Sequence, residues 1–180
     1  MYKITVGDWR KGKEAMQVVS GAMGRLKVHY EAPPSSEVPE RMEQLLAWIA
    51  DDTLTVDHLI KAAVAHLWFV TIHPFDDGNG RLCRTMTEML LSRADNTPQR
   101  YYSLSSEILN HRKDYYTQLE KAQCGKSDIT EWIVWFLEML IKALNAALEK
   151  TERIIRKVRF WDEHKELELN ARQRKVLNML

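Results

Sequence analysis

The sequence predicts an all-α domain with one short β-hairpin near its N-terminus. Glycine and proline cluster before residue 40, which makes that segment irregular. Within it, Arg25–Tyr30 has the alternation and the β-branched content of a short strand. After Pro39, apolar residues recur at helical spacing along most of the chain. With 180 residues, of which 45% are hydrophobic and 28% charged, the chain is long enough for one globular domain with a real core.

The first helices are predicted from their apolar periodicity and from the residues that end them. Pro39–Ala50 carries apolar side chains at helical spacing: Met42, Leu45, Leu46 and Ile49. Leu59–Ile72 is mostly apolar, and Pro74 ends it because a proline keeps the preceding residue out of the helical region. Another helix follows Gly80, with an apolar side formed by Met86, Met89, Leu90 and Leu91.

More helical segments are predicted after a loop around residues 96–98. Ser105–Gln123 is helical, with a break at His111. Asp128 then opens a long helix, because Asp128 with Glu131 has the pattern of a capping box and the apolar period continues to Val158. The last residues, Asn170–Leu180, have the pattern of the start of a further helix.

Composition and motifs exclude several classes of function. A net charge of +1 gives no global electrostatic reason to bind nucleic acid or a membrane. Cys83 and Cys124 form no metal-binding or redox spacing, so a reduced, cytoplasmic protein is expected. No P-loop or dinucleotide-binding motif occurs. No cysteine or glutamate completes a zinc site with the histidines, so His66 is predicted to be a satisfied histidine on its apolar helix.

One segment, His73–Arg84, contains most of the groups that can perform chemistry. His73 stands at a helix exit, where it is available as a general base. The following turn lies at the N-terminus of a helix, a place where free N–H groups and the helix dipole bind anions. Arg81 and Arg84 are three residues apart and project from one face, and guanidinium groups suit phosphate oxygens. Asp77 supplies a carboxylate for Mg²⁺. The segment therefore indicates a site for a nucleotide phosphate beside a nucleophile.

The same segment resembles the signature of the Fic family, His-x-Phe-x-(Asp/Glu)-Gly-Asn-Gly-Arg-x-x-Arg, at every specified position. The resemblance extends to a flap at about residues 24–34, and it implies a Fic-type helical bundle with this hairpin near the active site. The expected Fic domain covers residues 1–160. Residues 161–180 form a helical tail that is similar to the segment that leads into a winged-helix module in related proteins.

The resemblance implies a protein adenylyltransferase that transfers AMP from ATP to a Tyr, Thr or Ser hydroxyl of a target protein. His73 would be the general base, Phe75 a buried anchor under the loop, and Asp77 the ligand of Mg²⁺. The expected nucleotide-binding residues are Gly78, Asn79, Gly80, Arg81, Arg84, Tyr115 and Tyr116. Either of these tyrosines could instead be ordinary core. The target is expected to dock on the flap at Leu26–Tyr30 through backbone hydrogen bonds, and a plain surface hairpin is the alternative.

Two other functions fit the same residues. The chain could transfer another nucleotide or a phosphate group. By resemblance, kinase-like relatives have a lysine at the position of Gly80, so the glycine favours transfer of AMP. The chain could also be a nucleotide-binding regulatory module linked to DNA binding through a further C-terminal module, although an intact His73 favours an enzyme. Many Fic proteins carry an inhibitory helix with Ser/Thr-x-x-x-Glu-Gly/Asn. Ser103–Glu107 has this spacing, but Ile108 follows, so the inhibitory helix or partner is expected outside this chain.

Overall fold

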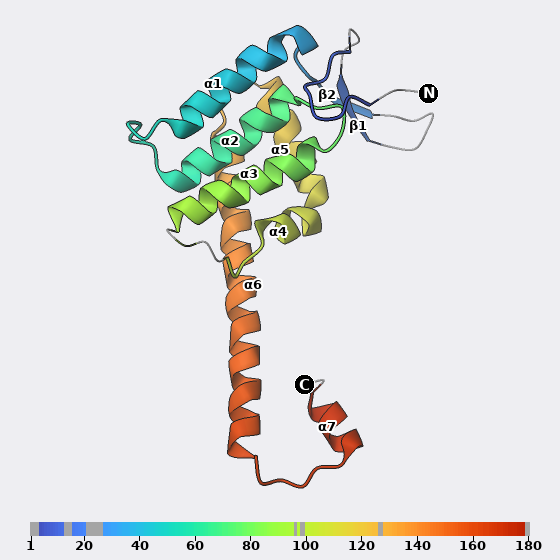
Figure 1. The fold of residues 1–180 in the computed structure, drawn as a ribbon, viewed down its shortest axis with the longest axis vertical. Coiled ribbons are helices and arrows are strands. Elements are labelled where there is room, and N and C mark those ends of the chain that lie inside the picture. The colour runs from blue at the N-terminus through green and yellow to red at the C-terminus, as the bar shows by residue number, and fades with distance from the viewer. Residues whose placement is uncertain are drawn as a thin grey trace. The chain divides into compact units, whose positions relative to one another are not determined.

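Helices form most of the described chain in the computed structural model, as the sequence predicts (Figure 1). The structure describes residues 4–12, 16–20, 27–95, 97, 100–125 and 128–178. The chain divides into two compact units, Met1–Leu144 and Asn145–Leu180. The expected domain limit at residue 160 stays a prediction.

The first unit begins with an irregular segment, residues 4–12, and a two-stranded antiparallel hairpin. Strand β1 (Gln17–Ser20) pairs with β2 (Lys27–Glu31), with Gln17 opposite Glu31 and a bulge after Val18. The predicted strand therefore continues one residue beyond Tyr30, and its residues 25 and 26 lie outside the described ranges. Of the expected flap, β2 and the segment up to Pro34 are described.

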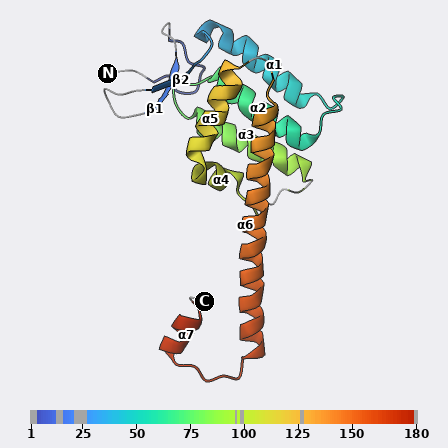
Figure 2. The same ribbon diagram turned by 180° about the vertical axis from the view of Figure 1, so that it is seen from behind.

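Three helices follow a short 3₁₀ turn at Ser35–Glu37: α1 (Val38–Ala50), α2 (His58–Ile72) and α3 (Asn79–Ala94). Helix α2 packs against both α1 and α3, and Figure 2 shows the three from behind. It has buried residues on all sides, as expected of a helix that is apolar all round. Asp57 caps its N-terminus by accepting a hydrogen bond from the Leu59 N–H at 2.8 Å.

The rest of the core comes from α4 (Leu104–Asn110), α5 (Arg112–Cys124) and the first part of α6 (Thr130–Glu163). The predicted break at His111 is confirmed, since this residue separates α4 from α5. Helix α6 packs an aromatic and apolar face into the core: Trp132, Trp135, Phe136, Met139 and Leu140.

The predicted capping box at the start of α6 is wrong. The Asp128 carboxylate accepts a hydrogen bond from the Thr130 N–H at 2.9 Å, which is a local turn. The Glu131 carboxylate, which would complete the box, instead pairs with Lys121 Nζ at 2.9 Å. The side chain of Glu131, which the local pattern assigns to the cap, is thus in an ion pair with another helix.

The second unit contains the rest of α6 and helix α7 (Ala171–Leu177). The predicted start of a helix at Asn170 is confirmed, with a capping box between Asn170 and Gln173. Within this unit Phe160 stacks on His164 with ring centroids 4.5 Å apart. Across the described ranges, no helix combines the length and the apolar character that a bilayer crossing requires.

Candidate active site

The loop that joins α2 to α3 is closed by the side chain of Asn79. Its Oδ1 accepts a hydrogen bond from the Phe75 N–H at 2.9 Å, and its Nδ2 donates to the Phe75 carbonyl at 2.7 Å. Gly78 has φ +86°, a conformation that other residues resist. Its carbonyl accepts hydrogen bonds from the Arg81 and Leu82 N–H groups. The N–H groups of Asn79 and Gly80 are the remaining donors at this end of α3, where an anion would bind.

His73 follows α2 in a left-handed conformation, with φ 49° and ψ 60°. Its half-buried ring lines a cavity of about 130 Å³. The same cavity is lined by most of the residues that the sequence assigns to the nucleotide: Asn79, Gly80, Arg84, Tyr115 and Tyr116. The fold therefore brings the expected base and the expected phosphate-binding residues to one place.

The environment of His73 favours the neutral imidazole. Burial lowers its pKa below the usual 6.5, the Val70 backbone carbonyl partly offsets this, and the charge of Arg10 lowers the pKa further. Its Nδ1 is buried without a hydrogen-bond partner among the described groups. A histidine that is neutral at pH 7 can accept a proton.

Arg84 reaches back along α3 to Gly80. A Cβ at Gly80 would lie 3.3 Å from Arg84 Nη1, tighter than nine in ten real contacts, so a side chain there would make the guanidinium shift by a few tenths of an ångström. Arg84, Tyr115 and Tyr116 also line a second cavity of about 480 Å³, whose other walls come from α4 and α5. The guanidinium of Arg84 thus stands between two cavities.

Asp77 and Arg81 lie at the surface. Their side chains are 70% and 75% exposed, and Arg81 Nη2 lies 3.3 Å from Asp77 Oδ2. Asp77 belongs to no group of three or more histidine, cysteine or acidic residues within the described ranges. A lone exposed carboxylate fits Mg²⁺ where substrate phosphates supply the other ligands, which is the usual arrangement for this ion.

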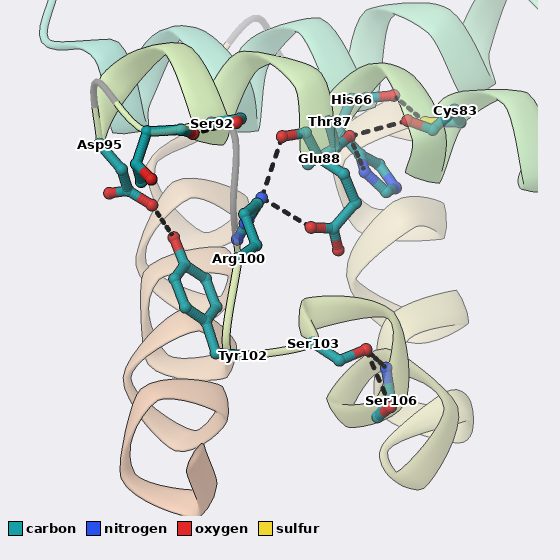
Figure 3. Close-up of polar contacts among 11 residues, drawn as sticks. His66, Cys83, Thr87, Glu88, Ser92, Asp95, Arg100, Tyr102, Ser103 and Ser106 are labelled. Atoms are coloured by element: carbon teal, nitrogen blue, oxygen red, sulfur yellow. Dashed lines mark hydrogen bonds and ion pairs between the residues drawn. The ribbon is translucent and has the colours of Figure 1, made fainter. Parts of the chain in front are cut away.

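Tyr115 reaches the cavity with a hydrogen-bonded network behind it. Its hydroxyl lies 3.0 Å from His66 Nε2, and His66 Nδ1 lies 2.9 Å from Thr87 Oγ1 (Figure 3 shows His66 and Thr87). Thr87 donates its single proton to the Cys83 carbonyl at 2.8 Å, so it accepts from His66 Nδ1–H. Nε2 is then the acceptor for Tyr115. The prediction that His66 is a satisfied core histidine is confirmed.

Burial dominates the protonation of this network. It lowers the pKa of His66 to about 3, and the charge of Arg84 acts in the same direction. It raises the pKa of Tyr115 well above 10. Both groups are therefore neutral at physiological pH, and the network positions Tyr115 as a wall of the cavity. Tyr116, on the same turn of α5, is half-buried beside it.

Sequence reasoning missed three residues that the fold brings to this site. Glu120 and Gln123 of α5 line the His73 cavity, one and two helical turns beyond Tyr116. Arg10 contacts the backbone of His73 from the irregular N-terminal segment. Glu120 and Gln123 could have been found from their helical spacing to Tyr116, whereas a single arginine among glycines has no pattern around it.

Fold and site together define a helical bundle with a tight turn at the N-terminus of α3 beside a histidine. The model of the Fic/DOC family matches residues 1–91, half of the chain, and the chain therefore belongs to this family.

Relatives and solved structures agree with this assignment. The chain is 37% identical over 95 residues to the protein adenylyltransferase fic-1 of Caenorhabditis elegans, covering 52% of this chain and 18% of that protein. It is 30% identical over 123 residues to the protein adenylyltransferase Fic of Aedes aegypti, covering 68% of this chain and 23% of that protein. This chain thus spans about a fifth of the length of these relatives.

The fold itself resembles solved Fic structures. A Fic family protein from Desulfovibrio desulfuricans G20 matches with a TM-score of 0.65 and 27% identity, covering 81% of this chain and 42% of that one. Fic-1 of C. elegans matches with a TM-score of 0.60 and 25% identity, covering 82% of this chain and 38% of that one. The predicted all-α bundle with a short hairpin is confirmed.

Proposed function

We propose that this chain carries the catalytic domain of a protein adenylyltransferase that transfers AMP from ATP to a hydroxyl group of a target protein. One observation carries the proposal: a neutral His73 lines the same cavity as Gly80 and Arg84. A base and a phosphate-binding turn within one cavity are the two parts that such a transfer needs. The names of the relatives, protein adenylyltransferases, support this choice.

In the proposed reaction, His73 takes the proton of a Tyr, Thr or Ser hydroxyl as its oxygen attacks the α-phosphate of ATP. The bond between the α- and β-phosphates breaks, and pyrophosphate leaves. A positioned base of this kind contributes ~10²–10⁴ in rate. Arg84 inside the cavity and Arg81 at the surface would neutralise the leaving phosphates, and the free N–H groups of α3 would bind the anion.

Asn79 would act through its backbone. Its side-chain amide is bonded at both ends to Phe75, so it holds the loop in shape and has only the second Nδ2 proton left for another acceptor. Its main-chain N–H is still available at the start of α3. Asp77 would hold Mg²⁺, which neutralises phosphate charge when bound. Its exposed pair with Arg81 is weak, so both side chains can turn toward the nucleotide at little cost.

The target would dock on the hairpin. In the described ranges the sheet has two strands, so β2 has one edge that β1 does not cover. Strand β2 also packs against α5, the helix that carries Tyr115 and Tyr116. An extended segment added to the free edge would therefore lie near the cavity, with the Leu26–Tyr30 region as its docking strand. The described part of this region is Lys27–Tyr30.

Intact-mass analysis after incubation with ATP and Mg²⁺ tests the proposal, with an exposed hydroxyl of this chain or an added protein as acceptor. A gain of one AMP that His73→Ala removes supports the proposed reaction. A gain of one phosphate identifies the alternative group transfer, and a panel of other nucleoside triphosphates tests for another nucleotide. Nucleotide binding without any covalent gain, with the fold intact, identifies a regulatory binding module and rejects the enzyme.

A further inference from the structure

The N-terminal segment, residues 4–12, lies along the loop that carries His73. The Thr5 N–H donates to Asp76 Oδ2 at 2.8 Å, and the Arg10 N–H donates to the Pro74 carbonyl at 2.9 Å. The rings of Trp9 and Phe75 are in contact, with centroids 5.0 Å apart. This segment therefore touches three consecutive residues after His73 and has no regular structure of its own.

The guanidinium of Arg10 holds the backbone on both sides of the histidine. Its Nε donates to the His73 carbonyl at 2.7 Å, and its Nη2 donates to the Ile72 carbonyl at 3.3 Å. The same Nη2 donates to the carbonyl of Pro33, just beyond β2. Arg10 is only 3% exposed. A planar fork of donors can satisfy several carbonyls in fixed directions, which a lysine ammonium cannot do equally well.

His73 needs such support because of its backbone conformation. Among the described residues, His73 is the one non-glycine residue with a positive φ, and the left-handed region of backbone angles is sterically unfavourable for a residue with a Cβ. A strained conformation persists only where the surroundings determine it. Two hydrogen bonds to the carbonyls of Ile72 and His73 fix the peptide planes that decide where the His73 ring points.

We propose that Arg10 is a positioning residue for the transfer reaction, which holds the His73 ring toward the cavity and fixes the end of β2 relative to it. The inference rests on the proposed function, in which His73 is the base and β2 receives the target. The side chain of Arg10 bonds both to the backbone at His73, which would deprotonate the hydroxyl, and to Pro33 just beyond β2, which would present that hydroxyl. The distance between the substrate oxygen and the imidazole would then be fixed before the reaction.

The test compares Arg10→Lys with Arg100→Lys. Arg100 is a half-buried arginine, whose side chain is 10% exposed and whose Nη1 donates to the Glu88 carbonyl at 3.0 Å (Figure 3). It does not line the His73 cavity. Both substitutions keep the charge and replace a guanidinium by an ammonium, so the comparison separates positioning of His73 from a general loss of stability.

We expect Arg10→Lys to lower kcat for AMP transfer by about tenfold to a hundredfold, because small misplacement of a catalytic group has effects of this size. KM for ATP should stay within about twofold, since Arg10 does not line the cavity. The NMR signals of the His73 ring should shift, and Arg100→Lys should change neither kcat nor these signals. Equal kcat for the two variants at matched stability, with the His73 signals unmoved, would overturn the proposal.

A second variant covers the case in which Arg10→Lys does not fold. Trp9→Leu removes the contact with Phe75 that anchors the segment carrying Arg10, and so loosens the hydrogen bonds of Arg10 to the Ile72 and His73 carbonyls. It should move the His73 signals and lower kcat in the same direction. Unchanged signals and an unchanged kcat would count against the inference. The NMR measurement needs no nucleotide transfer, so it reports on positioning even if intact-mass analysis rejects the adenylyltransferase.

Discussion

Two histidines seven positions apart, His66 on α2 and His73 directly after it, differ in role: one imidazole is structural and the other is placed for chemistry. His66 is fully buried, and both of its nitrogens are paired, with Thr87 and Tyr115. His73 follows the last turn of the helix, half-buried, and its ring lines the cavity. Burial lowers the pKa of both. A perturbed pKa therefore does not distinguish them, whereas the availability of a ring nitrogen does.

The largest expected effect is on catalysis, from His73→Ala. Transfer should fall by at least ~10²–10⁴, the range typical of general bases, while ATP binding and the free energy of unfolding change little. Single-turnover transfer and ATP titration measure the two. Loss of ATP binding in step with transfer would mean that His73 holds the nucleotide instead of activating the hydroxyl.

The opposite outcome is expected from His66→Leu. Leucine preserves apolar volume but leaves the Tyr115 hydroxyl without its acceptor, and the free energy of unfolding should fall by about 2–3 kcal/mol. Denaturant unfolding measures it, and the remaining folded protein should still bind ATP. His58→Leu, at the exposed start of the same helix, is the matched control and should stay within about 0.5 kcal/mol. Similar losses in both would remove the distinction between the two histidines.

Acid should destabilise the protein through His66. Its pKa is about 3 when folded and near 6.5 when unfolded, so the unfolded state binds the extra proton between these values. Stability is fully present above pH 6.5 and should fall by about 1.4 kcal/mol per pH unit below it, about 3 kcal/mol by pH 4. Hydrogen bonds to Lys11 and Thr53 and to Thr130 lower the pKa of the exposed carboxyl groups of Asp8, Asp51 and Asp128. What these groups contribute to stability is therefore lost only below about pH 4.

Unfolding curves between pH 7 and 4 measure this slope. In His66→Leu it should fall to the smaller share that His73 contributes, and in His73→Ala it should remain, reduced only by that share. A slope that is unchanged by His66→Leu would place the titrating group elsewhere.

The smallest expected effect comes from Thr87→Val. Valine keeps the shape but removes the acceptor of the His66 Nδ1–H, which should cost about 1–2 kcal/mol. Thr85→Val is the control, because Thr85 makes the same bond to the carbonyl four residues earlier but is exposed. It should change stability by less than about 0.5 kcal/mol in thermal unfolding. Equal changes in the two variants would show that the hydrogen bond between His66 and Thr87 contributes no more to stability than an exposed one.

The sequence could predict the parts of this molecule that depend on neighbouring residues. The turn between α2 and α3, the break at His111 and the start of α7 all follow from local patterns. The status of His66 also followed, because a histidine on an apolar helix with no metal partners has few other roles. The predictions of the turn, the break and the helix start succeed because their causes lie within a few residues of each feature, whereas the partners of His66, Thr87 and Tyr115, lie 21 and 49 residues away.

The parts that sequence reasoning missed depend on contacts across the chain. Glu131, the second half of the predicted capping box, pairs with Lys121 of α5 instead. The commitment of Asn79 to Phe75 decides whether its amide is free, and the motif does not reveal it. Arg10 acts on a residue 63 positions away. No periodic pattern connects such positions, so the fold has to be known first.

The left-handed backbone of His73 bears on how a bound target could be captured. An inactive variant that keeps its substrates needs a replacement that accepts φ near 49°. Asparagine enters this region more readily than other residues with a Cβ, whereas valine, isoleucine and threonine fit it worst. His73→Asn is therefore the replacement of choice for trapping a stalled complex, because it removes the imidazole and leaves the shape of the loop in place.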